Sequence, residues 1–253
     1  MKKTLIIIGF IGLIVGASWF GWSQMAKTPV VNSPQSEATS TVNDIKPAPV
    51  SLTEKEKLQQ QAIDIINRDI LIRVSLSAAT EAQAREKIKE LSDMIRGNFD
   101  YDAPWLDLGS YRRLIGDYDG AREAWEFLAK IRPQSYVVFH NLGDLYAYQF
   151  KNYLKGEEYF LKSIANAPGN IQGYIQLATI YQYYDTSKND KIEPLLLKGI
   201  TANPKDANLL ITLGEYYQDQ GRKTEALKYL EEALQLNPKN TSLQQEIEQL
   251  KNS

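Results

Sequence analysis

The side chains that commonly perform catalysis or bind metals are scarce in this chain. His140 is the single histidine and cysteine is absent, which excludes two-histidine metal sites, metal-thiolate sites and thiol nucleophiles. The aspartate pairs Asp100/Asp102 and Asp117/Asp119 lack the spacing and the bidentate glutamate of a calcium loop, so we expect them at a helix entry and an inter-helix turn. Neither a nucleotide-binding glycine loop nor a nucleophile elbow occurs. We therefore predict that the chain is not an enzyme and has no catalytic residue, metal site or cofactor.

The elements that would position any site are indicated by a repeat. Four prolines recur at intervals of 35, 36 and 34 residues, and a residue type that commonly caps helices stands two positions after each. Proline ends a helix because it lacks an N–H, and a Ser, Asn or Asp side chain can then accept from the free N–H groups of the next helix. The pairs are Pro133/Ser135, Pro168/Asn170, Pro204/Asp206 and Pro238/Asn240. This period predicts stacked helical hairpins.

Apolar and small residues recur between these prolines in one register. The units contain Trp105, Leu108, Gly109, Ala121 and Trp125; then Phe139, Leu142, Gly143, Tyr146, Gly156 and Phe160; then Tyr174, Leu177, Ala178, Tyr181, Ile192 and Leu196; and finally Leu210, Leu213, Gly214, Tyr217, Ala226 and Leu230. The pattern resembles the tetratricopeptide repeat, in which two antiparallel helices pack large residues against small ones. The third unit departs most, with two extra residues in its turn, and Arg112 replaces the aromatic residue expected in the first.

The resemblance implies an all-α, right-handed α-solenoid with four repeats in residues 102–240. Residues 51–101 are predicted to form a degenerate helical hairpin, in which Thr53/Glu56 and Thr80/Gln83 would be capping boxes that open helices at 53–75 and 80–96. Residues 241–253 are predicted to form a C-terminal capping helix, because a narrow apolar stripe runs along an otherwise polar segment.

The first residues predict a membrane anchor. Lys2 and Lys3 precede an uncharged run from 4 to 22 that is long enough for a transmembrane helix and ends near Trp19 and Trp22. We expect residues 1–22 to be a single-pass anchor with a cytoplasmic N-terminus and an extracytoplasmic repeat domain. The alternative is a cleaved signal sequence and a secreted protein. Residues 23–50, rich in Pro, Ser, Thr and Asn, are predicted to be a flexible polar linker.

The charge balance argues against nucleic acid as a partner. Residues 51–253 contain 25 Lys and Arg against 29 Asp and Glu, a net charge of −4 with the two signs interspersed. Binding to phosphates requires the opposite balance.

The resemblance places candidate partner-binding residues on the concave face, which is lined by the first helix of each hairpin. Amide side chains there can both donate to and accept from a peptide backbone, and tyrosines offer flat apolar area with a polar tip. The candidates are Arg113, His140, Asn141, Asp144, Tyr148, Gln172, Gln176, Thr179, Tyr183, Asn208 and Glu215. Arg113 is the only cation among them, which disfavours the clamp for a terminal carboxylate that some members of this family use.

These observations lead to one functional prediction with an alternative. We expect a membrane-tethered extracytoplasmic scaffold that binds a protein or peptide segment in its groove and acts as an adaptor or assembly factor. The alternative is a secreted, signal-cleaved assembly or structural component without enzymatic activity. An enzyme that uses His140 as a base is the least favoured, because a base needs a nucleophile and an orienting partner nearby. The sequence does not specify the oligomeric state.

Overall fold

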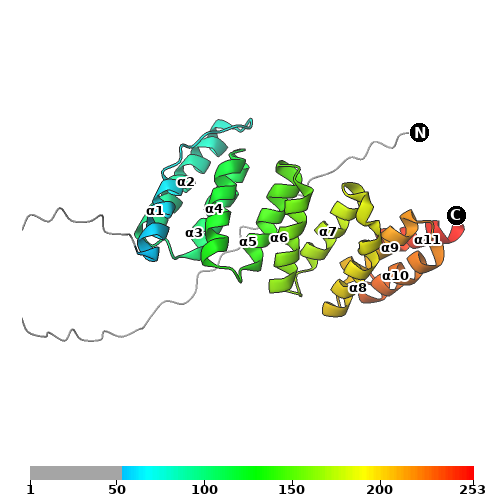
Figure 1. Ribbon diagram of the computed structural model, residues 1–253. Helices are drawn as coiled ribbons and strands as arrows, with labels where there is room; N and C mark the ends of the chain where they lie inside the picture. The colour runs from blue at the N-terminus through cyan, green and yellow to red at the C-terminus, as the bar shows by residue number, and fades with distance from the viewer. Residues whose placement is uncertain (1–52) are drawn as a thin grey trace, which may run out of the picture. The chain divides into compact units, whose positions relative to one another are not determined.

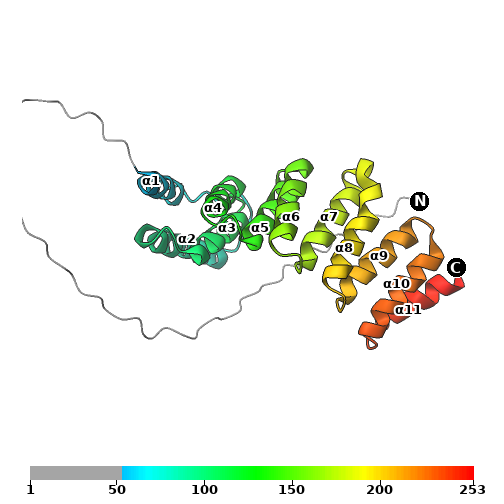
Figure 2. The ribbon, with the colours of Figure 1, turned by 60° about the horizontal axis from the view of Figure 1, so that its bottom comes forward.

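The computed structural model describes residues 53–253, which are helical and contain no strand. The helices follow one another in chain order as a row of antiparallel hairpins (Figures 1 and 2). Their bounds are α1 Glu54–Ile66, α2 Ala78–Gly97, α3 Asp102–Leu114, α4 Tyr118–Ile131, α5 Tyr136–Asp144, α6 Tyr153–Asn166, α7 Ile171–Tyr183, α8 Ile192–Ala202, α9 Ala207–Asp219, α10 Lys223–Leu236 and α11 Thr241–Asn252, with a π-helical turn η1 at Leu145–Gln149 and a 3-10 turn η2 at Thr186–Lys191. The predicted all-α solenoid is confirmed for these residues.

Small residues allow the two helices of a hairpin to approach closely. A Cβ added to Gly109 would lie 2.2 Å from Nε1 of Trp125, and one added to Gly214 would lie 2.7 Å from Leu230. The large partners are fully buried, with Trp125 at 1% and Leu230 at 0% exposure. The hairpins α3/α4 and α9/α10 therefore pack in the register that the repeat predicts.

Two turns accommodate the departures from a regular repeat. The third unit has its two extra residues in η2, between α7 and α8, as the sequence indicates. The second unit has one extra residue that was not predicted: Gly143 and Gly156 are 13 positions apart, whereas Gly109 and Ala121 are 12 apart. The π-helical turn η1 absorbs it, since the Phe150 N–H reaches back to the Leu145 carbonyl at 3.1 Å.

Helix capping matches the prediction at only two of the four proline units. Asp206 and Asn240 accept from N–H groups of α9 and α11, respectively. Ser135 and Asn170 occupy the N-cap positions of α5 and α7 without a side-chain cap, so their predicted capping role is wrong. The Asn170 side chain donates instead to Oγ of Ser163, at 3.0 Å, because a buried hydroxyl on the preceding helix competes for it.

The first two helices also differ from the prediction at their boundaries. Thr53 and Glu56 form the expected capping box, but α1 ends at Ile66 rather than at 75. Helix α2 begins at Ala78, and Ser77 rather than Thr80 is its N-cap, with Oγ accepting from the Thr80 N–H at 3.1 Å. The predicted Thr80 capping box is therefore wrong.

Arg112, which replaces an aromatic residue, is a buried structural cation. Its side chain is fully buried beside Asp117, whose Oδ2 lies 2.6 Å from Nη1. The same guanidinium donates to the carbonyls of Arg68 at 2.9 Å and Asp69 at 3.2 Å. Charged groups tolerate burial when they are paired and hydrogen-bonded. Arg112 thus ties the segment after α1 to the α3/α4 hairpin.

The predicted single-pass membrane localisation requires correction. None of the helices in residues 53–253 is long and apolar enough to cross a membrane. Even α2, with 20 residues, carries charges along its length. The anchor at 1–22 and the linker at 23–50, on which that prediction depended, lie outside the described residues. At the other end, Leu243, Ile247 and Leu250 of α11 are buried, as expected of the apolar stripe of a capping helix.

Candidate partner-binding face

The first helices of successive hairpins form a continuous row of side chains that we call the inner face. It comprises the side chains of α3, α5 with η1, α7, α9 and α11 that are not packed inside the hairpins. Contacts join the helices from α3 to α9: Arg113 to Asp144 at 3.9 Å, the Tyr148 hydroxyl to Gln176 at 2.5 Å, and Gln182 to Asp219 at 2.8 Å. All eleven predicted site residues belong to these helices. Their binding of a partner stays a prediction.

Between α3 and α5, the inner face holds a polar cluster of Arg113, His140 and Asp144. The Asp144 carboxylate lies 3.9 Å from Arg113 and 4.0 Å from Nε2 of His140. Burial raises the pKa of Asp144, although the two neighbouring basic groups oppose the shift. The His140 ring also lies edge-on to Phe160, with 5.4 Å between ring centroids. Arg113, the only cation among the predicted site residues, thus already lies beside a carboxylate.

Tyrosines gather at the middle of the row. The Tyr148 hydroxyl donates to Oε1 of Gln176, and its ring lies edge-on to Tyr184, which stacks on Tyr153 with 4.7 Å between centroids. Burial is the main cause of the raised pKa of Tyr148, with smaller contributions from Asp144 and the two tyrosines. Tyr148 is therefore half-buried and hydrogen-bonded, and so less available to a partner than the sequence suggests.

Tyr183 is the most exposed aromatic residue of the inner face. Its side chain is 56% exposed, although it lies at the end of α7 beside two carboxylates of α9. Burial of its hydroxyl, together with the charges of Asp219 and Glu215, raises the pKa of Tyr183. Asp219 and its hydrogen-bond partner Gln182 were not among the predicted site residues. Their positions in the sequence could have indicated them, since Asp219 lies one helical turn after Glu215 and Gln182 directly precedes Tyr183.

The remaining candidates differ in how free their polar groups are. Gln172 and Asn208 are exposed, while Asn141 is half-buried. The Thr179 hydroxyl donates to the Ile175 carbonyl of its own helix at 2.9 Å, which leaves it less available for a partner. The exposed amides are thus the better candidates for contacting a peptide backbone.

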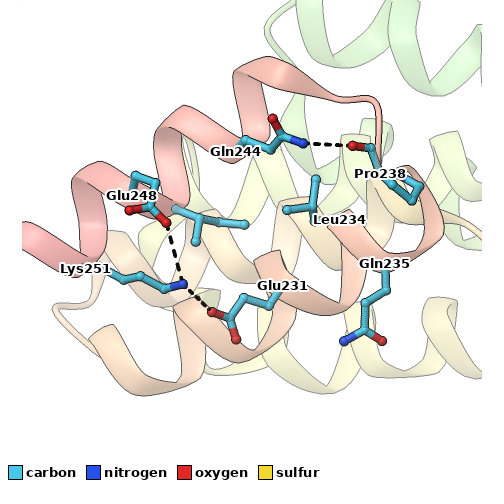
Figure 3. A pocket seen from close by; sticks show the side chains of 8 residues that line it. Glu231, Leu234, Gln235, Pro238, Gln244, Glu248 and Lys251 are labelled. Atoms are coloured by element: carbon cyan, nitrogen blue, oxygen red, sulfur yellow. Dashed lines mark hydrogen bonds and ion pairs between the residues drawn. The ribbon is translucent and has the colours of Figure 1, made fainter.

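A cavity at the C-terminal end lies between α10 and α11 (Figure 3). Its lining residues are Glu231, Leu234, Gln235, Pro238, Gln244, Ile247, Glu248 and Lys251. The Lys251 ammonium lies 3.0 Å from Glu231 and 3.8 Å from Glu248, and Gln244 donates to the Pro238 carbonyl at 2.8 Å. Four of the lining polar side chains, those of Glu231, Gln244, Glu248 and Lys251, thus already have partners, which disfavours the cavity as a ligand site.

Comparison with known proteins supports the repeat assignment. Residues 207–240, which span α9 and α10, match the tetratricopeptide repeat family model. A crystal structure of MamA is similar with a TM-score of 0.53 at 18% identity, covering 67% of this chain and 99% of that one. The structure of MamA from residue 41 to its end, from Desulfovibrio magneticus RS-1, has a TM-score of 0.50 at 17% identity, with 75% and 99% covered. At these identities the likeness shows the fold alone.

One curated relative is similar in sequence. The antiviral innate immune response effector IFIT1 of Macaca fascicularis is 27% identical over 175 residues, which is 66% of this chain. The chain spans about a third of the length of that relative, of which 35% is covered. The tetratricopeptide fold is typically a non-catalytic scaffold for interactions between proteins. The family model thus supports a tetratricopeptide repeat at residues 207–240, and the similar structures share the fold of the described residues.

Proposed function

We propose that this protein is a non-enzymatic scaffold that binds a polypeptide segment of a partner along its inner face. The observation that carries the proposal is the row of polar and aromatic side chains that contacts link from α3 to α9, in which Tyr183 is 56% exposed. An exposed aromatic ring on an otherwise polar surface is typical of an interaction site.

The chemistry of the row suits a peptide rather than a small molecule. Exposed amides such as Gln172 and Asn208 can pair with both the N–H and the carbonyl of a peptide bond. Arg113 is engaged by Asp144, which disfavours capture of a terminal carboxylate. A peptide that runs across several helices would contact these groups in sequence, as a repeat array with an extended binding surface allows.

The test is capture of the partner by cross-linking in cells, followed by identification of the captured protein. The double variant Tyr148→Ala/Tyr183→Ala should reduce capture at least tenfold, which corresponds to about 1.4 kcal/mol or more. Tyr183→Ala alone should account for most of the loss, because Tyr148 is half-buried and hydrogen-bonded. Thermal melting of the variants reports whether the fold is retained.

The matched control removes two exposed side chains from second helices, Leu154→Ala on α6 and Lys228→Ala on α10. This control should leave capture unchanged. Loss of capture in the control together with full capture by the tyrosine variant would show that the partner binds the outer helices instead.

A further inference from the structure

Basic side chains are missing from the inner helices in the middle of the row. Among the described residues, α5, η1, α7 and α9 contain no lysine or arginine, whereas α6, α8 and α10 each contain at least one. Several carboxylates of these outer helices have cations close by, as in Glu158 with Lys162 at 2.6 Å and Glu193 with Arg222 at 3.0 Å. Between α5 and α10, the inner and outer helices therefore differ in charge.

Three carboxylates of α9 and α11 on the inner face lack this compensation. Glu215 and Asp219 of α9 and Glu246 of α11 take part in none of the ion pairs found within residues 53–253, all of which have N–O distances of 4.0 Å or less. Burial first, and then the charges of Glu246 and Asp219, raise the pKa of Glu215. Burial also raises the pKa of Glu246. Like charges held together and partly desolvated are unfavourable, so a cationic partner would relieve the repulsion.

Tyr183 adds an aromatic ring to the same place. Its side chain is exposed, and the negative charges of Asp219 and Glu215 contribute to the raised pKa of its hydroxyl. Gln182 donates to Asp219 at 2.8 Å and holds that carboxylate beside the ring. An ammonium or guanidinium group can lie over a tyrosine ring and pair with carboxylates at once. The surface therefore offers an apolar contact and charge complementarity together.

A divalent metal ion fits this surface less well than a basic side chain. Within the described part of the chain, no group of three or more His, Cys, Asp or Glu residues is close enough to hold a metal ion. The carboxylates are instead spread over α9 and α11 next to a ring. Spread charges suit a chain with several cationic side chains, which can each pair with one carboxylate.

We propose that the occupant of the inner face is a basic polypeptide segment, whose lysine or arginine side chains lie against Tyr183 and pair with Glu215, Asp219 and Glu246. This inference rests on the proposed function and names the chemistry of the partner. Electrostatic complementarity of this kind contributes to specificity and to the rate of association.

The experiment uses the purified full chain and three fluorescein-labelled probe peptides of equal length, in which alanine alternates with lysine, glutamate or glutamine. Fluorescence anisotropy gives the dissociation constant at low and at physiological salt. The lysine peptide should bind at least tenfold more tightly than the other two, and its affinity should fall as salt increases. The neutralised variant Glu215→Gln/Asp219→Asn/Glu246→Gln should weaken binding of the lysine peptide at least tenfold.

A matched variant separates the local effect from net charge. Glu158→Gln/Asp190→Asn/Glu232→Gln removes an equal number of negative charges, from α6, η2 and α10. This variant should bind the lysine peptide with an affinity within twofold of that of the unmodified chain. Equal losses in the two variants would overturn the inference, because they would show that only net charge matters.

Other outcomes distinguish this inference from the proposed function. Tighter or equal binding of the glutamate or glutamine peptide, with dependence on Tyr183, would overturn the basic partner and leave polypeptide binding intact. Absence of binding by all three peptides would overturn the basic partner as well. The proposed function itself would then still be decided by capture in cells with the tyrosine variants.

Discussion

Replacing Arg112 by alanine should strongly destabilise the α3/α4 hairpin. Arg112 is fully buried, and its guanidinium donates to Oδ2 of Asp117 at 2.6 Å, to the Arg68 carbonyl at 2.9 Å and to the Asp69 carbonyl at 3.2 Å. The substitution would remove these bonds and leave the fully buried Asp117 carboxylate without its nearest cation.

The magnitude follows from what remains around Asp117. Removing one partner of a buried ion pair typically costs about 3–5 kcal/mol. Here Arg68 Nε lies 3.4 Å from Oδ2, and the Gly120 N–H still donates to Oδ1 at 3.1 Å. This partial compensation places the expected loss near the lower end, at about 3 kcal/mol. For a chain of this size, that loss corresponds to a decrease in melting temperature of roughly 6–12 °C.

Urea titration of the full chain, followed by circular dichroism, measures this loss. Arg113→Ala on the same helix is the control, because Arg113 is 44% exposed and its ion pair with Asp144 is long, at 3.9 Å. This substitution should change the free energy of unfolding by no more than about 0.5 kcal/mol. The double variant Arg112→Ala/Asp117→Ala should lose less than the sum of the two single losses, since the orphaned charge is removed too. A loss below about 1 kcal/mol for Arg112→Ala would refute the reasoning.

Three further outcomes are expected. Gly143→Leu should lower the free energy of unfolding by more than the ~1–3 kcal/mol usual for overpacking, because even a Cβ would lie 2.8 Å from the Phe160 ring. An unchanged melting temperature, or an equal effect from Gly97→Ala at an open position, would contradict the register of the repeat. Glu215→Gln should stabilise the chain at pH 7 but not near pH 4. The raised pKa of Glu215 means that the folded state binds more protons than the unfolded state, so the stability of the unmodified chain falls as pH rises from the ordinary value of 4.5 through the raised pKa. Equal stability of the variant and the unmodified chain at pH 7 would count against the burial of this carboxylate. Ile247→Asp, at a side chain that is 3% exposed, should detach α11 and lower the melting temperature; no shift would show that α11 does not stabilise the solenoid.

The hairpin architecture could be predicted because it depends on volume at fixed spacings. Gly109 faces Trp125 and Gly143 faces Phe160 in the structure, as the alternation of small and large residues requires. Local choices were harder to predict. The side chain of Asn170 could cap α7 or reach Ser163, and only the packed arrangement of α6 and α7 decides in favour of Ser163.

The sequence could predict which helices carry the candidate site residues but not which contacts their side chains make. The eleven residues fall on the expected helices, yet the hydroxyl of Tyr148 is already bonded to Gln176. Tyr148 lies in the π-helical turn, whose extra residue shifts the end of the helix, and the spacing of the repeat alone does not reveal such a shift. Asp219 and Glu246 were missed because their significance depends on neighbours from other helices, Tyr183 and Glu215.

Site-specific photo-cross-linking tests the central claim, that the inner face is the surface that binds the partner. Tyr183 and Tyr229 are replaced one at a time by p-benzoylphenylalanine, which keeps an aromatic side chain at each position. Tyr183 belongs to the inner face at the end of α7, and Tyr229 lies on α10, stacked on Tyr217. Irradiation of the full chain in cells should give an adduct with a polypeptide partner from position 183 and none from position 229. An adduct from position 229 alone would contradict the account.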